Sequence, residues 1–169
     1  LAAGQPASRI GPSGDLIRRS PRSKTDPILL MANEKKKISV RVREATRNDI
    51  PGLIALNKEA YPMLAEDNVV WGETHLLSHQ RLFPQGQFVA EYKGRILGAA
   101  SSLVVNLGSD PLRNHTWSGI TDSGFFTNHD PDGDTLYGAD VCTHPESRGM
   151  GVGAALYEAR RQLCKKLNL

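Results

Sequence analysis

A basic residue followed by alternating glycines stands directly before an apolar helical pattern, in the run Arg148-Gly149-Met150-Gly151-Val152-Gly153. The first amides of a helix have no acceptor within the helix, and the helix dipole favours negative charge there. Glycines let the backbone approach a phosphate closely, and arginine adds a fork of donors. The run therefore predicts a phosphate-binding turn. A glycine-rich helix entry that serves packing alone is the alternative interpretation.

Two common phosphate loops do not fit this run. No Gly-Lys-Ser/Thr ending is present, so the run is not a Walker-type loop. The glycine spacing is G-x-G-x-G and not the G-x-G-x-x-G of dinucleotide-binding folds. The turn must therefore belong to another class of phosphate-binding protein.

Other reactive residue types form weaker patterns. The run Asp130-Pro131-Asp132-Gly133-Asp134 is similar to the start of a calcium loop, but it lacks the terminal Glu and flanking helices. His115, His129 and His144 show no ligand spacing, so we expect no metal site. Four aromatic residues could line a substrate cleft, although such residues more often pack in cores and loops. These are Trp71, Trp117, Phe125 and Phe126.

The hydrophobic pattern predicts the elements on either side of the phosphate turn. A strand is expected over Thr135–Thr143, ended by His144-Pro145, and an amphipathic helix begins at Gly151. Its predicted inner stripe recurs at the helical period. The stripe consists of Val152, Ala155, Leu156, Ala159, Leu163 and Leu167.

The chain before this strand alternates between strand and helix patterns. A strand is expected around Ile38–Val42, followed by a helix from Ile50 to about Tyr61 and another over Thr74–Leu82. Strands Gln87–Tyr92 and Arg95–Val105 flank a Lys-Gly turn and predict a hairpin. The order β-α-α-β-β-β-α indicates an α/β (α+β) fold. Residues 106–134 are either a functional loop or contain short elements that the pattern does not resolve.

Together these features resemble the GNAT superfamily of N-acetyltransferases. The family motif Q/R-x-x-G-x-G/A after its fourth strand is matched by Arg148, Gly151 and Gly153. The segment Val42–Ile50 is similar to the family's usual opening, and the resemblance covers residues 38–169. It implies a mixed, mostly antiparallel sheet flanked by helices.

The resemblance implies acetyl-CoA as the co-substrate and an amine as the acceptor. Val141, Cys142 and Thr143 would bind the pantetheine arm through their backbones, and a backbone N–H near Val141 would polarise the thioester carbonyl. Arg148 and the following residues would hold the diphosphate, with a small-molecule or peptide amine attacking directly. Those following residues are Gly149, Met150, Gly151, Val152, Gly153 and Ala154.

The acceptor amine must lose a proton, which calls for a general base. Relatives often use a strand carboxylate four residues before the Val141 position, where this chain has Tyr137. Asp140 is the nearest carboxylate, and regular alternation would place it on the opposite face from Tyr137. We name both residues as catalytic candidates, although each also fits a structural role.

The family fold continues beyond the motif helix, so the chain is expected to lack the C-terminal part of the domain. Trp117-Ser118 and the segment His129–Gly138 also resemble a subgroup in which the domain precedes a carbon–nitrogen hydrolase domain. The sequence therefore predicts an N-acetyltransferase, whose activity this fragment alone would lack, and a downstream domain fused to it. The alternative is a catalytically silent acyl-CoA-binding or regulatory module.

Charge and composition separate a tail from the domain. Residues 1–30 hold five basic and two acidic residues, so the whole net charge of +3 lies there, and the rest has no net field for nucleic acid. We assign residues 1–37 to a disordered tail, or to leader or added sequence before Met31, and 38–169 to the domain.

No run of the sequence is apolar enough for a membrane span. Two cysteines without C-x-x-C spacing favour a reducing, cytoplasmic setting.

Overall fold

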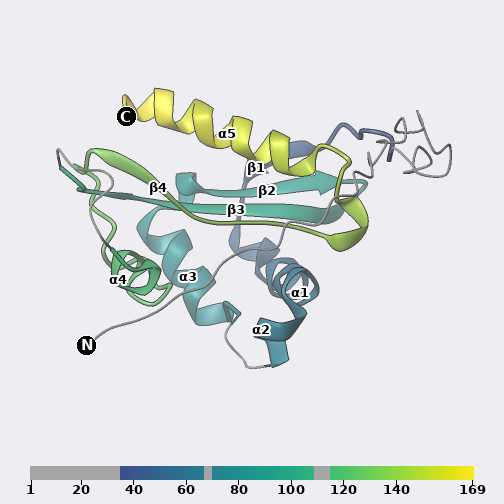
Figure 1. The fold of residues 1–169 in the computed structure, drawn as a ribbon, viewed down its shortest axis with the longest axis horizontal. Helices are drawn as coiled ribbons and strands as arrows, with labels where there is room; N and C mark the ends of the chain where they lie inside the picture. The colour runs from purple at the N-terminus through teal and green to yellow at the C-terminus, as the bar shows by residue number, and fades with distance from the viewer. Residues whose placement is uncertain (1–34, 67–69, 109–114) are drawn as a thin grey trace, which may run out of the picture. The chain divides into compact units, whose positions relative to one another are not determined.

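The alternating apolar residues of the hairpin and its neighbours form an antiparallel sheet in the computed structural model (Figure 1). The structure describes residues 35–66, 70–108 and 115–169. Within them the strand order is β1-β2-β3-β4, and every neighbouring pair is antiparallel. The strands are β1 (Arg41–Glu44), β2 (Gln87–Tyr92), β3 (Arg95–Val105) and β4 (Thr135–Thr143). The predicted bounds of the last three strands are confirmed.

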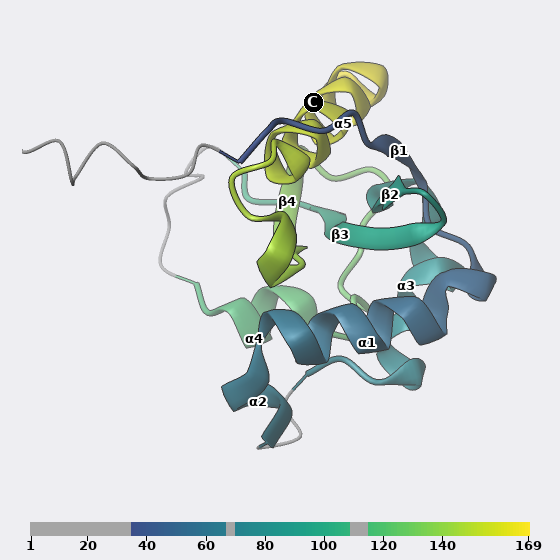
Figure 2. The ribbon, with the colours of Figure 1, turned by 90° about the vertical axis from the view of Figure 1, so that its right-hand side faces the viewer.

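Helices cover both faces of this sheet, as Figures 1 and 2 show. Helix α5 lies on one face, and α1, α3 and α4 lie on the other. Their bounds are α1 (Ile50–Ala60), α2 (Pro62–Glu66), α3 (Glu73–Leu82), α4 (Trp117–Thr121) and α5 (Val152–Leu167). The sequence pattern predicted α1, α3 and α5, whereas α2 and α4 were not predicted. The mixed, antiparallel α+β architecture is confirmed.

Each face of the sheet has its own core. On the α5 face, Val152 and Leu156 pack against Ala90 and Ala100 and are almost fully buried. Gly98 allows this close approach, because a Cβ there would lie 2.8 Å from Val152 Cγ1. On the other face, apolar residues of α1 and α3 pack against β2, β3 and β4. Each buried aliphatic side chain contributes about 1.5–3 kcal/mol.

An ion-paired carboxylate fixes the start of α1. Asp49 accepts hydrogen bonds from the Thr46 amide at 2.7 Å and from its hydroxyl at 2.8 Å. Its two oxygens also pair with Arg43 of β1, which in turn contacts Glu91 of β2. Arg43 holds the pKa of Asp49 far below its usual range. The start of α1 is therefore tied to β1 and, through Arg43, to the neighbouring strand β2.

The compact unit begins at Lys35, and the greater part of the predicted tail, residues 1–34, lies outside the described residues. Lys35 Nζ donates to the Glu146 carbonyl at 2.7 Å, and the Ile38 amide donates to the Met150 carbonyl at 3.0 Å. These bonds place the first described residues beside the predicted phosphate turn. No helix in the described part of the chain is long and apolar enough to cross a membrane.

Candidate active site

The predicted phosphate turn leads from β4 into α5. Gly149 and Gly151 have φ angles of +82° and +92°, and the space where each Cβ would project is open. The first helical hydrogen bond joins the Ala155 amide to the Gly151 carbonyl. The amides of Val152, Gly153 and Ala154 therefore precede it and have no acceptor within the helix. Two left-handed glycines before helix amides without an intrahelical acceptor fit the diphosphate of a CoA thioester.

Two side chains join this turn to α1. The buried His144 ring accepts a hydrogen bond from the Glu146 amide through Nδ1, and its Nε2 lies 2.5 Å from Glu59 Oε2. Arg148 Nη2 lies 3.4 Å from the Ala60 carbonyl, at the C-terminal end of α1. In this conformer Arg148 therefore reaches toward α1, whereas the sequence pattern predicted that it binds phosphate. His144, which no motif singled out, positions the turn.

The strand leading into the turn has one open edge in the described part of the sheet. The His144 amide donates to the Leu97 carbonyl, and Cys142 pairs with Ala99. Because antiparallel ladder bonds alternate, the backbone polar groups of Val141 and Thr143 point away from β3. Cys142 was predicted to share the binding of a pantetheine arm, but its backbone faces β3. Its thiol is buried, and burial raises its pKa.

A β-bulge interrupts β4 at Ala139. Ser101 pairs with Asp140, but the next residue, Ser102, pairs with Gly138, so Ala139 is an extra residue on β4. A bulge disturbs the alternation of side chains along the strand. The register therefore corrects our expectation about faces. Asp140 and Tyr137 point to the same side of the sheet, the side covered by α1, α3 and α4.

Arg160 of α5 binds the bulged strand from the opposite face. Its Nη2 donates to the Asp140 carbonyl at 2.8 Å and to the Ser101 carbonyl at 3.1 Å, and its Nε donates to Ser102 Oγ at 3.0 Å. A Cβ at Gly138 would lie 2.7 Å from this guanidinium. Glycine at position 138 thus leaves room for an arginine that satisfies carbonyls at the bulge.

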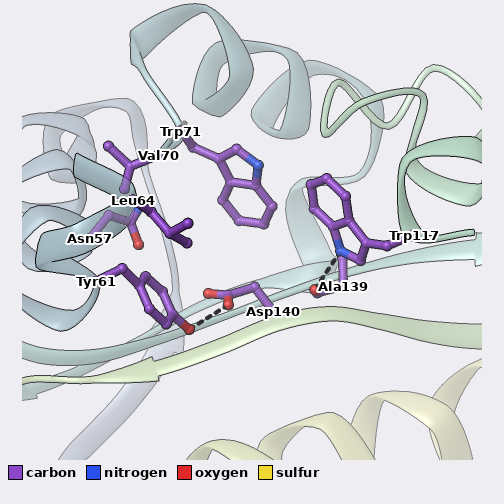
Figure 3. Close-up of a pocket in the computed structure, with 8 residues that line it drawn as sticks. All are labelled: Asn57, Tyr61, Leu64, Val70, Trp71, Trp117, Ala139 and Asp140. Atoms are coloured by element: carbon purple, nitrogen blue, oxygen red, sulfur yellow. Dashed lines mark hydrogen bonds between the residues drawn. The ribbon is translucent and has the colours of Figure 1, made fainter. Parts of the chain in front are cut away.

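The two catalytic candidates have different surroundings. Tyr137 packs into an apolar cluster with Leu103 and Phe126, and its ring meets His115 edge to face. Asp140 instead lines a pocket of about 380 Å³. We call this cavity the Asp140 pocket. Its lining residues are Asn57, Tyr61, Leu64, Val70, Trp71, Trp117, Ala139 and Asp140 (Figure 3).

The Asp140 carboxylate is held at one side of the pocket by Tyr61. The Tyr61 hydroxyl donates to Asp140 Oδ1 at 2.7 Å (Figure 3). Burial raises the pKa of Asp140, and the hydrogen bond from Tyr61 lowers it in part. The same burial, together with Asp140, raises the pKa of Tyr61 well above its ordinary value. Asp140 is therefore a stronger base than an exposed aspartate.

The chain matches the model of the acetyltransferase (GNAT) family over residues 51–169. The chain belongs to the GNAT acetyltransferase family. It is 44% identical over 136 residues to the probable hydrolase YhcX of Bacillus subtilis, covering 80% of this chain and 25% of that protein. It is 36% identical over 125 residues to the uncharacterized N-acetyltransferase YkwB of the same organism, covering 74% and 55% respectively. The chain thus spans a quarter and about half of these two relatives.

A solved GNAT-like structure agrees with this assignment. The GphF GNAT-like decarboxylase in complex with isobutyryl-CoA superposes with a TM-score of 0.58 and 25% identity. The alignment covers 70% of this chain and 55% of that one. The family membership supports acetyl transfer in general terms.

Part of the pocket's lining was predicted from the sequence. Trp71 and Trp117 were considered for a cleft and do line the pocket. Phe126, considered with them, is fully buried, and Phe125 stacks on His75. Tyr61, which lines the pocket and bonds Asp140, was not singled out from the sequence, where it marked only the end of a predicted helix. Its place directly after α1 and before a proline gave no chemical signal.

Proposed function

We propose that this chain transfers an acetyl group from acetyl-CoA to a primary amine, by direct attack of the amine while both substrates are bound. The position of Asp140 carries the proposal. Its carboxylate lies in a pocket, and the next residues of its strand have backbone groups that point away from β3 and lead into the phosphate turn. The Val141 carbonyl among them also lies 3.4 Å from the Tyr61 hydroxyl. A proton acceptor and a strand suited to an extended thioester therefore meet at one point.

The donor side of the site is made mostly of backbone. The first amides of α5 and the two left-handed glycines would hold the diphosphate. The outward-facing groups of Val141 and Thr143 would pair with the pantetheine arm. When bound, acetyl-CoA supplies a thioester carbonyl as the electrophile. The isobutyryl-CoA held by the similar GNAT-like decarboxylase supports an acyl-CoA donor.

The acceptor side needs a base. An unperturbed amine has a pKa near 10 and is mostly protonated at neutral pH. The ammonium must lose one proton before its nitrogen can attack, and Asp140, whose pKa is raised by burial, would take that proton. The second proton, lost as the nitrogen bonds to the acetyl carbon, would pass to the departing sulfur. The sulfur leaves with the electron pair of the broken carbon–sulfur bond. The Val141 amide, beside Asp140, would polarise the carbonyl.

Acetyl transfer can be measured as release of the CoA thiol with a panel of primary amines. Asp140→Asn keeps an acceptor for the Tyr61 hydroxyl but removes the base. We expect kcat to fall about 100-fold or more, with the acetyl-CoA affinity unchanged by calorimetry. Asp132→Asn, in the exposed turn before β4, is the matched control and should behave as the wild type.

A wild-type kcat in Asp140→Asn would exclude Asp140 as the base. Acetyl-CoA binding without transfer to any amine would favour the silent-module alternative. The predicted fusion to a carbon–nitrogen hydrolase domain stays a prediction, with which the similarity to YhcX is compatible.

A further inference from the structure

The walls of the Asp140 pocket are apolar and partly aromatic. Leu64, Val70 and the two tryptophans line it together with Tyr61 and Ala139. Leu64 and Trp117 remain 45% and 43% exposed, and both face the same space (Figure 3). At about 380 Å³ the pocket is at the small end of the range for small-molecule sites. It therefore suits a compact ligand with substantial apolar surface.

The tryptophans are held in place by the rest of the domain. Trp117 Nε1 donates to the carbonyl of the bulge residue Ala139 at 3.0 Å. Trp71 meets the rings of His79 and Phe126 edge to face, with centroids 4.7 and 5.6 Å away. The two indoles lie nearly parallel, 6.3 Å apart between centroids. A preformed wall of this kind orients a ligand without a further ordering cost.

Gly124 leaves the space that the Trp71 indole occupies in this wall. Its φ is +90°, and a Cβ there would lie 2.6 Å from Trp71 Nε1. Only glycine at this position leaves the indole of Trp71 where it is. The shape of the aromatic wall is thus set by the backbone of the loop after α4.

The charge of the pocket is limited to one group. Asp140 is the single acidic side chain among the described lining residues, and no basic side chain stands among them. One of its oxygens already accepts from Tyr61. A second ammonium group held within the pocket would lie against Leu64, Val70 or an indole, without a carboxylate partner among the described lining residues. Burying an unpaired charge is strongly unfavourable.

Resting on the proposed acetyl transfer, we propose that the acceptor is a small monoamine with a compact apolar body, preferably an aromatic one. Its nitrogen lies at Asp140, and its apolar body lies against Leu64 and the two indoles. An aromatic body gains edge or stacked contacts with the indoles, and a residual ammonium charge is attracted by their faces. Polyamines and lysine-rich peptides are disfavoured by their additional charges.

Binding can be followed without any reaction, because this chain has two tryptophans and both line the pocket. The tryptophan fluorescence of the protein is titrated with 2-phenylethylamine, 3-methylbutylamine and spermidine, with and without CoA, which cannot donate an acetyl group. We expect saturable changes with the first two amines. In acetyl transfer, kcat/KM for 2-phenylethylamine should exceed that for spermidine at least 10-fold.

A charge placed in the pocket wall tests the cause of this preference. Leu64→Glu adds a second carboxylate at an exposed position, so the fold should tolerate it. We expect kcat/KM for 2-phenylethylamine to fall about 10-fold and the ratio of spermidine to 2-phenylethylamine to rise. Met63→Glu is the matched control, since Met63 is 79% exposed and is not among the pocket's lining residues. It should leave both values unchanged.

The outcomes separate this inference from the proposed function. Spermidine used as well as 2-phenylethylamine, or Leu64→Glu behaving like Met63→Glu, would overturn the apolar-monoamine assignment and leave acetyl transfer standing. Acetyl-CoA binding without a fluorescence response to either apolar amine would do the same. Failure to bind acetyl-CoA at all would instead overturn the proposed function.

Discussion

The phosphate turn consists of consecutive residues, Arg148–Ala154, whereas the Asp140 pocket takes its walls from segments spread between residues 57 and 140. The turn acts through backbone amides and left-handed glycines. The pocket acts through side chains that three helices, a bulge and a loop bring together. A binding site made of consecutive backbone groups can be predicted from the sequence, because the spacing of its residue types defines it. A site of distant side chains becomes visible only in the fold.

The strongest test of the turn is a substitution that leaves the pocket intact. Gly151→Asp places a negative side chain in the open space before the α5 amides. We expect acetyl-CoA affinity to fall on the order of 100-fold in calorimetry, because charge-assisted bonds are lost and the diphosphate is repelled. Fluorescence changes caused by apolar amines should persist.

Gly94→Asp is the control for this change. Gly94, in the turn between β2 and β3, has a φ of +78° and equally open space. The control therefore adds a similar backbone strain and the same charge away from α5. Unchanged acetyl-CoA affinity in a folded Gly151→Asp protein would contradict the phosphate assignment.

A substitution at Arg160 should affect the pocket more than the turn. Arg160→Met removes the guanidinium that donates to the Asp140 and Ser101 carbonyls. We expect a loss of about 1–3 kcal/mol in unfolding free energy, seen as a lower melting temperature. Acetyl transfer should fall further than acetyl-CoA affinity, since Arg160 positions the strand that carries Asp140.

Arg161→Met is the neighbouring control. Arg161 pairs with Glu158 on the exposed side of α5, where ion pairs contribute little. Its melting temperature should stay close to that of the wild type. Equal effects of the two substitutions would argue against a role of Arg160 at the bulge.

The smallest expected effect is a shift in pH dependence at Tyr61. A general base must be deprotonated, so the rate falls as the pH drops through the pKa of Asp140. The Tyr61 hydrogen bond lowers this pKa, which burial has raised. Tyr61→Phe should therefore move the acidic limb of the kcat profile to higher pH, with nearly wild-type rates at alkaline pH.

Tyr157→Phe, on the exposed side of α5, should leave the profile in place. An acidic limb that moved to lower pH in Tyr61→Phe would contradict the assignment of Asp140. The free energy of unfolding should also depend on pH through Asp140. Because the pKa of Asp140 is raised in the folded protein, its contribution to stability is complete below the pKa of the unfolded chain. That contribution is lost as the pH rises through the pKa of the folded protein.

Strongly periodic segments were predictable from the sequence. The hairpin of β2 and β3 and the stripe of α5 carry their own patterns, and the structure confirms them. Helices α2 and α4 have five residues each, too few to show a helical period. Both were missed, although α4 carries Trp117 and α2 carries Leu64.

The bulge had one sequence signal. Gly138 is an isolated glycine inside a strand pattern, which is typical of a bulge or a close approach. Regular alternation was assumed instead, so Asp140 and Tyr137 were expected on opposite faces. The partnership of Asp140 with Tyr61 joins residues 79 positions apart, which periodicity cannot show.

Helix α5 also sets a length. Its first residue, Val152, stands at the phosphate turn, and Arg160 holds the strand at the bulge. Eight residues at 1.5 Å each separate the two along about 12 Å of helix. One residue inserted between them would turn Arg160 by about 100° around the axis, away from the carbonyls it binds. This stretch of α5 is therefore a rigid spacer whose residue number is constrained independently of its composition.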